Sequence, residues 1–392
     1  MLEKIIFVTG SCILILLVTL ILIEVLIRIK EKISDFVYQD KLTDNFHPNY
    51  HKYINYYASW DDALFSYDQI IGFRLLNDKN KKFQNFIKIN KLGFRTHEFN
   101  ELGNDDEFSI IFNGGSAAFG SGASSNEHMI STYLENKLNE ISKKKVRVYN
   151  LAQINNFQTQ EILTLIFLFN KIKPKIVISF NGWNELTANN IMNDKTIKSF
   201  ELFNITELEG WKPGLSKSII KKNFINSNYI FLNEYLKCLK YLPFINASSF
   251  SRRDRDRKNF RSFNEGVKVG SKLYLKNMDL FNKISKGFNF KYFAFLQPYI
   301  TKKNLTQEEK KLLEYRRNEN PLLKDEDMID EIIKMDNLYK FIDGKNDNIY
   351  NLYNFFGNES SNIFYNMVHL NDKGQEMIAK KIFETIKNEI PN

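Results

Sequence analysis

The sequence predicts an α/β fold, with a mainly parallel sheet covered by helices on both faces. Short apolar runs of strand length alternate along the chain with longer segments in which apolar residues recur at helical spacing. Repeated units of this kind build parallel sheets, and their connecting helices cover both faces. The composition agrees, because 392 residues with 43% hydrophobic and 14% aromatic content supply ample core for one large domain or two modest ones.

The first predicted strand, residues 108–112, runs directly into a glycine-rich turn. Residues 113–120 read Asn-Gly-Gly-Ser-Ala-Ala-Phe-Gly, so Ser116 lies on this turn. After the turn, apolar residues at helical spacing predict a helix: Met129, Ile130, Tyr133, Leu134, Leu138 and Ile141. Ser116 is therefore expected on a strand-to-helix turn.

Further strands and helices follow in the same alternation. We expect strands at residues 146–151, 176–180, 292–296 and 348–352, and helices at 159–171, which Pro174 follows, and at 306–340. The segment 372–386 is amphipathic and predicts a C-terminal helix. Between residues 187 and 290 the pattern loosens, and we expect a mostly helical insertion there.

The predicted turn gives Ser116 the surroundings that an acyl-transfer nucleophile requires. Such a turn raises the hydroxyl above the sheet edge, and backbone N–H groups at the positive end of the helix point at any anion that forms there. Ligands of parallel sheets bind beyond the carboxyl ends of the strands, which is where Ser116 falls. For this stretch taken alone, a glycine-rich connection without chemistry remains the alternative.

A second stretch, far along the chain, supplies a histidine. Residues 366–374 read Asn-Met-Val-His-Leu-Asn-Asp-Lys-Gly, and His369 is one of only five histidines. Taken alone, it fits a surface histidine before a helix. Together with Ser116, it predicts an enzyme that cleaves esters or transfers acyl groups.

The N-terminal segment predicts a membrane anchor. Residues 5–27 are almost wholly apolar and long enough, at about 1.5 Å per residue, to cross a hydrocarbon layer of roughly 30 Å. A cleaved signal peptide, the alternative, would have a shorter core and a small-residue cleavage site, whereas this core runs into Arg28, Lys30 and Lys32. We expect an anchor over residues 1–32, a connecting segment over 33–100 and the main domain over 101–392.

The remaining composition gives no sign of a metal, a cofactor or a nucleic-acid partner. The net charge of +9 is spread widely and accompanies no nucleic-acid motif. Cys12 lies in the apolar segment and Cys238 far outside it, so neither a disulfide framework nor a cysteine metal site is implied. His47 and His51 are four residues apart, but Pro48 between them argues against a shared helix face.

Four blocks, in order, resemble the SGNH (GDSL-type) hydrolases. They are Gly114-Gly115-Ser116, residues 150–155 (Asn-Leu-Ala-Gln-Ile-Asn), Gly182-Trp183-Asn184-Glu185, and residues 366–369 (Asn-Met-Val-His). The resemblance covers nearly everything from residue 90 onward, and residues 90–95 resemble a segment that often precedes the nucleophile in membrane-anchored members. It implies a three-layer α/β/α sandwich, in agreement with the order of strands and helices.

The resemblance also implies a role for each matching residue. Ser116 would attack an ester carbonyl, and His369 would take its proton and return it to the leaving alcohol. The oxyanion would be held by the backbone N–H of Ser116, the backbone N–H of Asn155 and the side-chain amide of Asn184. Gly115 and Trp183 would line the substrate site; Trp183 either stacks on a sugar ring or packs in the wall.

Two positions depart from the family pattern. Asn155, or Asn156 if the alignment shifts by one residue, stands where the family usually has glycine; asparagine tolerates a left-handed backbone better than most residues. Asn366 stands where the family has an aspartate that orients His369 and stabilises the imidazolium. A neutral amide can accept the Nδ1 hydrogen but cannot offset the charge, and in a serine protease the same change costs about four orders of magnitude in turnover.

We therefore expect a membrane-anchored esterase or acyltransferase that acts on O-acyl esters through a Ser116 acyl-enzyme. By analogy with anchored relatives, the expected substrate is acylated cell-envelope carbohydrate, with the catalytic domain outside the cytoplasmic membrane of a bacterium. Two alternatives remain. One is a catalytically impaired member that binds glycan or scaffolds a membrane complex, which Asn366 favours. The other is a lipid esterase facing the cytoplasm, which the positive charges after residue 27 favour.

Overall fold

The structure is a computed structural model of the whole chain. It describes residues 87–99, 106–154, 156–185, 263–310, 336–337, 339–342, 344–364 and 367–391, the strand residues 65–68 and 72–75, and isolated helical residues between 7 and 29. One compact unit takes in Asn45–Glu207 and Arg261–Asn392. Every strand and helix named below belongs to this unit.

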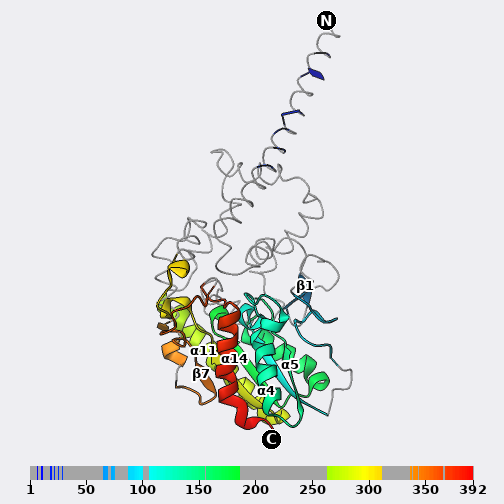
Figure 1. The fold of residues 1–392 in the computed structure, drawn as a ribbon, viewed down its shortest axis with the longest axis vertical. Coiled ribbons are helices and arrows are strands. Elements are labelled where there is room, and N and C mark those ends of the chain that lie inside the picture. Colours follow the sequence, from blue (N-terminus) through cyan, green and yellow to red (C-terminus); the bar gives the residue numbers. More distant parts are fainter. Residues whose placement is uncertain are drawn as a thin grey trace. The chain divides into compact units, whose positions relative to one another are not determined.

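Five parallel strands form the central sheet (Figure 1), which confirms the predicted α/β class. They are β3 (Glu107–Gly114), β4 (Lys145–Asn150), β5 (Ile176–Asn181), β6 (Lys291–Leu296) and β7 (Ile349–Asn351), in the spatial order β4-β3-β5-β6-β7. All four neighbouring pairs are parallel. The order runs outward from β3 in both directions, so the carboxyl end of β3 lies at the point where the chain changes direction across the sheet. This is where ligands of open α/β sheets bind.

Helices cover both faces of the sheet. On one face lie α3 (Ser116–Phe119), α4 (Ile130–Ile141) and α14 (Asp372–Ile386), and on the other lie α5 (Gln158–Ile172) and α11 (Phe263–Phe288). Ser179 of β5 donates to Glu161 of α5, whereas Asn150, which pairs with Phe112 in β3 and so lies on the opposite face, donates to Ala118 of α3. Figure 1 shows α4 and α14 side by side.

The core lies between the sheet and these helices. Every residue of β5 is buried, as expected for a strand covered on both faces. Aromatic rings fill much of the space: Phe112 stacks on Phe180 across two strands, and Phe281 stacks on Tyr292 with 4.3 Å between ring centroids.

The helix α11 belongs to the layered core. Its residues Tyr274, Met278 and Phe281 are fully buried, at the spacing of one helix face, and Tyr274 donates to Asn181 of β5. The C-terminal part of the region 187–290, predicted as an insertion, is therefore a core helix. Residues 186–262 lie outside the described residues, so the rest of the insertion stays a prediction.

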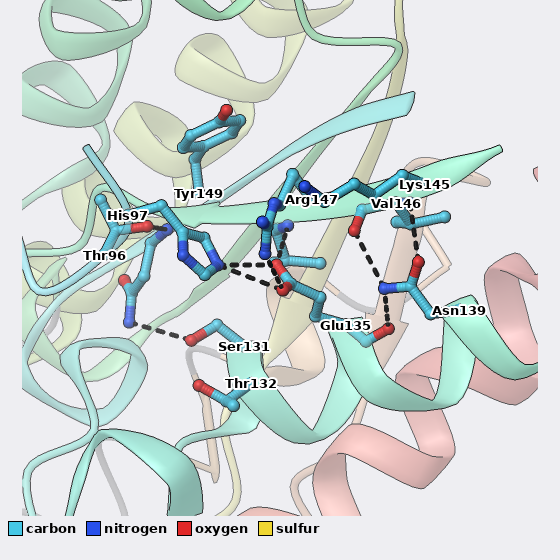
Figure 2. Close-up of polar contacts among 12 residues, drawn as sticks. Thr96, His97, Ser131, Thr132, Glu135, Asn139, Lys145, Val146, Arg147 and Tyr149 are labelled. Carbon is cyan, nitrogen blue, oxygen red and sulfur yellow. Dashed lines mark hydrogen bonds and ion pairs between the residues drawn. The ribbon is translucent and has the colours of Figure 1, made fainter. Parts of the chain in front are cut away.

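Residues 87–99, just before the sheet, attach to its β4 side through a buried carboxylate (Figure 2). Glu135 of α4 accepts from His97 at 3.0 Å, from Arg147 of β4 at 3.0 Å and from the backbone N–H of Val148 at 2.7 Å. One side chain thus joins three segments. Farther toward the N-terminus, β1 (Phe65–Asp68) and β2 (Gly72–Leu75) form an antiparallel pair within the predicted connecting segment.

The predicted anchor, residues 5–27, lies almost entirely outside the described residues, and it stays a prediction. Among the residues that are described, no helix combines the length and apolar character needed to cross a membrane. The proposed boundaries at residues 32 and 100 are likewise untested.

Candidate active site

Ser116 is the first residue of α3, and only Gly115 separates it from the end of β3 at Gly114. The turn between them depends on Gly114, whose φ is +150°. A Cβ at Gly114 would lie 2.2 Å from the carbonyl oxygen of Phe180 and 2.5 Å from the Cβ of Ala118. Only glycine permits this close approach of β3, α3 and β5, which places Ser116 at the carboxyl edge of the sheet.

His369 lies against Ser116. Its Nε2 is 2.6 Å from the serine Oγ, although the two residues are 253 positions apart in the sequence. Both side chains are partly exposed. With Nε2 unprotonated, the serine hydroxyl donates to it, which is the arrangement of a nucleophile and its general base. The structure therefore brings together the two residues that the sequence predicts as nucleophile and base.

The side-chain amide of Asn184 lies beside the backbone of the nucleophile turn. A Cβ at Gly115 would lie 2.3 Å from its Nδ2. The same nitrogen donates to the carbonyl oxygen of Asn156 at 2.7 Å. An amide nitrogen carries two hydrogens, so one remains for a ligand at Ser116.

The second block of the resemblance also reaches this place. Asn156 is buried, and its carbonyl oxygen would lie 3.5 Å from a Cβ at Gly115. Asn155 lies outside the described residues, so the oxyanion role expected of it stays a prediction. Asn366 is likewise outside them, and its relation to His369 stays open.

Trp183 packs in the wall of this region. Its ring stacks on that of Tyr299, with 5.1 Å between centroids and 18° between planes. Tyr299 is buried, so this face of the indole meets the protein core. Of the two roles considered for Trp183, the structure shows wall packing on one face.

The loop that carries His369 is held at both ends. A β-bridge between Phe364 and Leu370 closes it, and the N–H of Ile300 donates to the carbonyl of Met367. Glu309 accepts from the N–H groups of Ile363 and Phe364 through one oxygen, and from Lys303 at 2.7 Å through the other.

The Lys303–Glu309 pair is fully buried, with both side chains at 0% exposure. Loss of either partner would leave a buried charge uncompensated. Because Glu309 also accepts from Ile363 and Phe364, the pair fixes the backbone that leads into the loop of His369.

The helix after His369 is tied to the loop after Ser116. Asn371 caps α14 by accepting from the N–H of Gly374. Asp372 accepts from the N–H of Ser124 at 2.7 Å and from its hydroxyl at 2.5 Å. Gln375, which is buried, accepts from the N–H of Ile130 at the start of α4. These contacts explain how residues so distant in sequence meet.

Sequence reasoning missed Ser124 and Asp372. An asparagine and an aspartate before an amphipathic helix are a recognisable helix start, and this signal was present at Asn371 and Asp372. No sequence signal of this kind indicates that Ser124 is the partner of Asp372. His128 Nδ1 also lies 2.9 Å from the Ser124 hydroxyl. The serine stands between histidine and aspartate, whereas in a catalytic triad the histidine stands in the middle, so this cluster is a clamp and no second triad.

Two buried glutamates hold the turn that carries Asn184: Glu185 is the last residue of this turn, and Glu161 bonds to Asn181 just before it. Burial, together with the charge of Glu185, raises the pKa of Glu161 to about 8. Burial raises the pKa of Glu185 to about 7, against the opposing effect of its backbone hydrogen bonds. Glu185 belongs to the third block of the resemblance, whereas no sequence motif indicates Glu161.

In the part of the chain that the structure describes, no group of three or more histidine, cysteine, aspartate and glutamate side chains is placed to hold a metal ion.

No protein-family model matches this sequence, and no curated protein matches it. Among solved structures, the chain is similar to the lipase Lip_vut3 from a goat rumen metagenome, with 14% identity over 71% of this chain and 96% of that one, at a TM-score of 0.36. It is also similar to the acetyl xylan esterase AlAXEase (12% identity, 71% and 100%, TM-score 0.34) and to TesA (9% identity, 71% and 98%, TM-score 0.34).

Proposed function

We propose that this protein is a serine esterase or acyltransferase that works through an acyl-enzyme on Ser116. The observation that carries the proposal is the 2.6 Å contact between Ser116 Oγ and His369 Nε2 on a strand-to-helix turn. A serine hydroxyl is a weak nucleophile unless a base takes its proton, and the contact provides that base.

In the proposed reaction, Ser116 Oγ attacks the ester carbonyl carbon while His369 Nε2 takes the hydroxyl proton. The carbonyl π electrons move to oxygen, and the amide of Asn184 and the N–H of Ser116 stabilise that anion. Collapse of the intermediate breaks the bond to the alcohol, which leaves with the proton from His369. Water or a second alcohol then attacks the acyl-enzyme, and the same steps in reverse order release Ser116.

The finer parts of the proposal rest on the sequence. The apolar segment 5–27 supports a membrane anchor, and the resemblance to anchored hydrolases supports O-acylated cell-envelope carbohydrate as substrate, with the domain outside the cytoplasmic membrane. A periplasmic reporter enzyme fused to the C-terminus tests the orientation. An active reporter supports it, and an inactive one favours the cytoplasmic alternative.

One observation favours a second candidate function. Asn366 stands three residues before His369, where a carboxylate would offset the imidazolium charge. A protein without this carboxylate has a low turnover or none. It would bind glycan or scaffold a membrane complex through the same surface.

Reaction with a fluorophosphonate distinguishes the two candidates. This probe forms a covalent bond with a serine whose hydroxyl is activated. We expect labelling of the full-length protein in mild detergent, loss of labelling in Ser116→Ala and His369→Ala, and unchanged labelling in Ser142→Ala, which alters a serine at the far end of α4. No labelling, together with glycan binding that Ser116→Ala leaves intact, would establish the binding protein.

A further inference from the structure

The reaction proposed above does not use the two buried glutamates beneath Asn184. Glu161 lies in the first turn of α5, and Glu185 directly follows Asn184. Both side chains are buried, although a glutamate is rarely buried without a partner. Their positions at the carboxyl end of β5 suggest a task connected with the site.

All four carboxylate oxygens accept hydrogen bonds from the end of β5 or the start of α5. Glu161 accepts from the hydroxyl of Ser179 at 2.6 Å and from the amide of Asn181 at 3.0 Å. Glu185 accepts from the N–H of Gly182 at 3.1 Å and from the N–H of Gln158 at 3.0 Å. The two carboxylates thus fix residues 179, 181 and 182 by hydrogen bonds.

Asn184 lies in the turn that these hydrogen bonds hold. The turn from Gly182 to Glu185 is closed by the bond between its own ends, and Gly182 has a φ of +124°. Asn184 reaches from this turn to Asn156 and to the backbone beside Ser116. A change in the hydrogen bonds between the carboxylates and the turn therefore moves the side-chain amide of Asn184, which faces the reacting carbonyl.

The surroundings oppose two negative charges here. Among the described residues, the titratable groups that face the pair are Tyr274 of α11, Tyr292 of β6 and Tyr339. Burial raises the pKa of each tyrosine far above its usual value, so all three stay neutral. Burial of both groups and the charge of Glu185 on Glu161 therefore disfavour two negative charges on the pair at neutral pH.

We propose that Glu161 and Glu185 are positioning residues, of which at least one keeps its proton at neutral pH, and that their hydrogen bonds hold the turn carrying Asn184 in its catalytic arrangement. Loss of the proton places two like charges beneath the turn, loosens the contacts to Gly182 and Asn181, and shifts Asn184 away from the oxyanion. The protein consequently loses activity as the pH rises. This inference rests on the proposed esterase or acyltransferase function.

The two glutamates respond differently to replacement by glutamine. In Glu161→Gln the carbonyl still accepts from Asn181, and the new amide donates to the Ser179 hydroxyl, which is able to accept. In Glu185→Gln one of two backbone N–H groups loses its acceptor, because an amide offers one oxygen where the carboxylate offered two.

The first measurement is the pH dependence of kcat for hydrolysis of a small acetyl ester, from pH 6 to 9.5, with the full-length protein. Wild type loses activity above about pH 8, following the raised pKa values of the pair. Glu161→Gln carries this loss to higher pH by about one unit or more, because two charges can no longer form beside the turn. Glu185→Gln also carries the loss to higher pH, and in addition it lowers kcat roughly tenfold, because one backbone N–H loses its acceptor. The control Glu107→Gln, at the opposite end of β3, keeps the wild-type profile. If kcat of Glu161→Gln falls above pH 8 at the same pH as kcat of wild type, the inference is overturned.

The second measurement needs no activity. The chain has three tryptophans, and Trp183 lies in the turn itself, so 5-fluorotryptophan labelling gives a ¹⁹F signal that Trp183→Phe assigns. This signal titrates between about pH 6.5 and 9 in wild type and in Glu107→Gln. In Glu161→Gln the part of the titration at higher pH disappears, and only the transition of Glu185 near pH 7 is left. A signal that titrates equally in Glu161→Gln contradicts the inference.

A third variant covers the case in which Glu161→Gln does not fold. The hydroxyl of Ser179 lowers the pKa of Glu161, so Ser179→Ala moves the ¹⁹F midpoint to higher pH, and an unmoved midpoint contradicts the inference. If Ser116→Ala hydrolyses the ester as fast as wild type, the proposed function fails. The ¹⁹F titration then decides separately whether the pair controls the turn.

Discussion

At the scale of single residues, the site depends on two glycines that let neighbouring groups approach the backbone before Ser116 closely. The two glycines before Ser116 have different tasks: Gly114 admits the carbonyl of Phe180, and Gly115 admits the amide of Asn184. The sequence indicated a turn here, because glycines directly follow an apolar run. It did not indicate which atoms occupy the space that each glycine leaves.

Gly115→Ala tests the position of Asn184. The new Cβ would lie 2.3 Å from Nδ2 and would push the amide aside, so we expect a loss of about 100-fold in kcat, comparable to the loss of one oxyanion donor. The matched control is Gly287→Ala on α11, where a Cβ meets nothing within 4 Å. Ester hydrolysis at equal folded fraction is the measurement. Equal rates in wild type and Gly115→Ala would exclude Asn184 as an oxyanion donor.

At the scale of elements, the site depends on how the start of α14 is fixed to the loop after α3. Asp372 is three residues past His369, and Ser124 is eight residues past Ser116. Their two hydrogen bonds join the two catalytic segments directly. Because a displacement of about 1 Å costs roughly two orders of magnitude in rate, this clamp matters for chemistry as well as for folding.

Asp372→Ala removes both bonds of the clamp, and we expect kcat to fall at least about tenfold with little change in KM. Asp372→Asn keeps an acceptor for the Ser124 N–H and a donor for its hydroxyl, and it should recover most of the loss. Asp279→Ala, which breaks an exposed pair with Lys283, serves as control. A kcat for Asp372→Ala equal to wild type, at equal folded fraction, would refute a positioning role.

The contacts around Glu135 (Figure 2) join residues 87–99 to α4 and β4, and they predict a stability that depends on pH. Burial alone would raise the pKa of Glu135, but hydrogen bonds from His97 and Val148 and the charge of Arg147 outweigh it, so the pKa is lowered. A lowered pKa in the folded protein contributes stability above the unfolded value of 4.5, and this stability is lost as the pH falls through the folded value.

Thermal unfolding between pH 3 and 8 checks this contribution. Glu135→Gln should lower stability by about 1–3 kcal/mol at pH 7, since Arg147 and a buried N–H lose a charged acceptor, and should reduce the further loss toward pH 3. Glu140→Gln, at an exposed position on the same helix, should behave as wild type. Parallel acid-unfolding curves for wild type and Glu135→Gln would contradict the account.

At the scale of the whole molecule, the sequence predicted the local elements well and their long-range partners poorly. The expected helix 372–386 matches α14, and the expected strand 176–180 lies within β5, because periodicity and turn residues are local signals. α11 was placed in an insertion, since nothing local shows that Tyr274 reaches Asn181. The pairing of Ser116 with His369 was expected only through two motifs, while the Ser124–Asp372 clamp and the Glu161 contacts depend on the assembled fold.

The central claim is that Ser116 and His369 form a working nucleophile and base, and hydrolysis of a small acetyl ester tests it most directly. We would compare the full-length protein with Ser116→Ala, His369→Ala and Asn366→Asp. The account predicts measurable turnover that falls by at least about 1000-fold in the first two variants and rises in the third, where a carboxylate can support the imidazolium. Turnover that survives in Ser116→Ala, or its absence in all four proteins, would contradict the account.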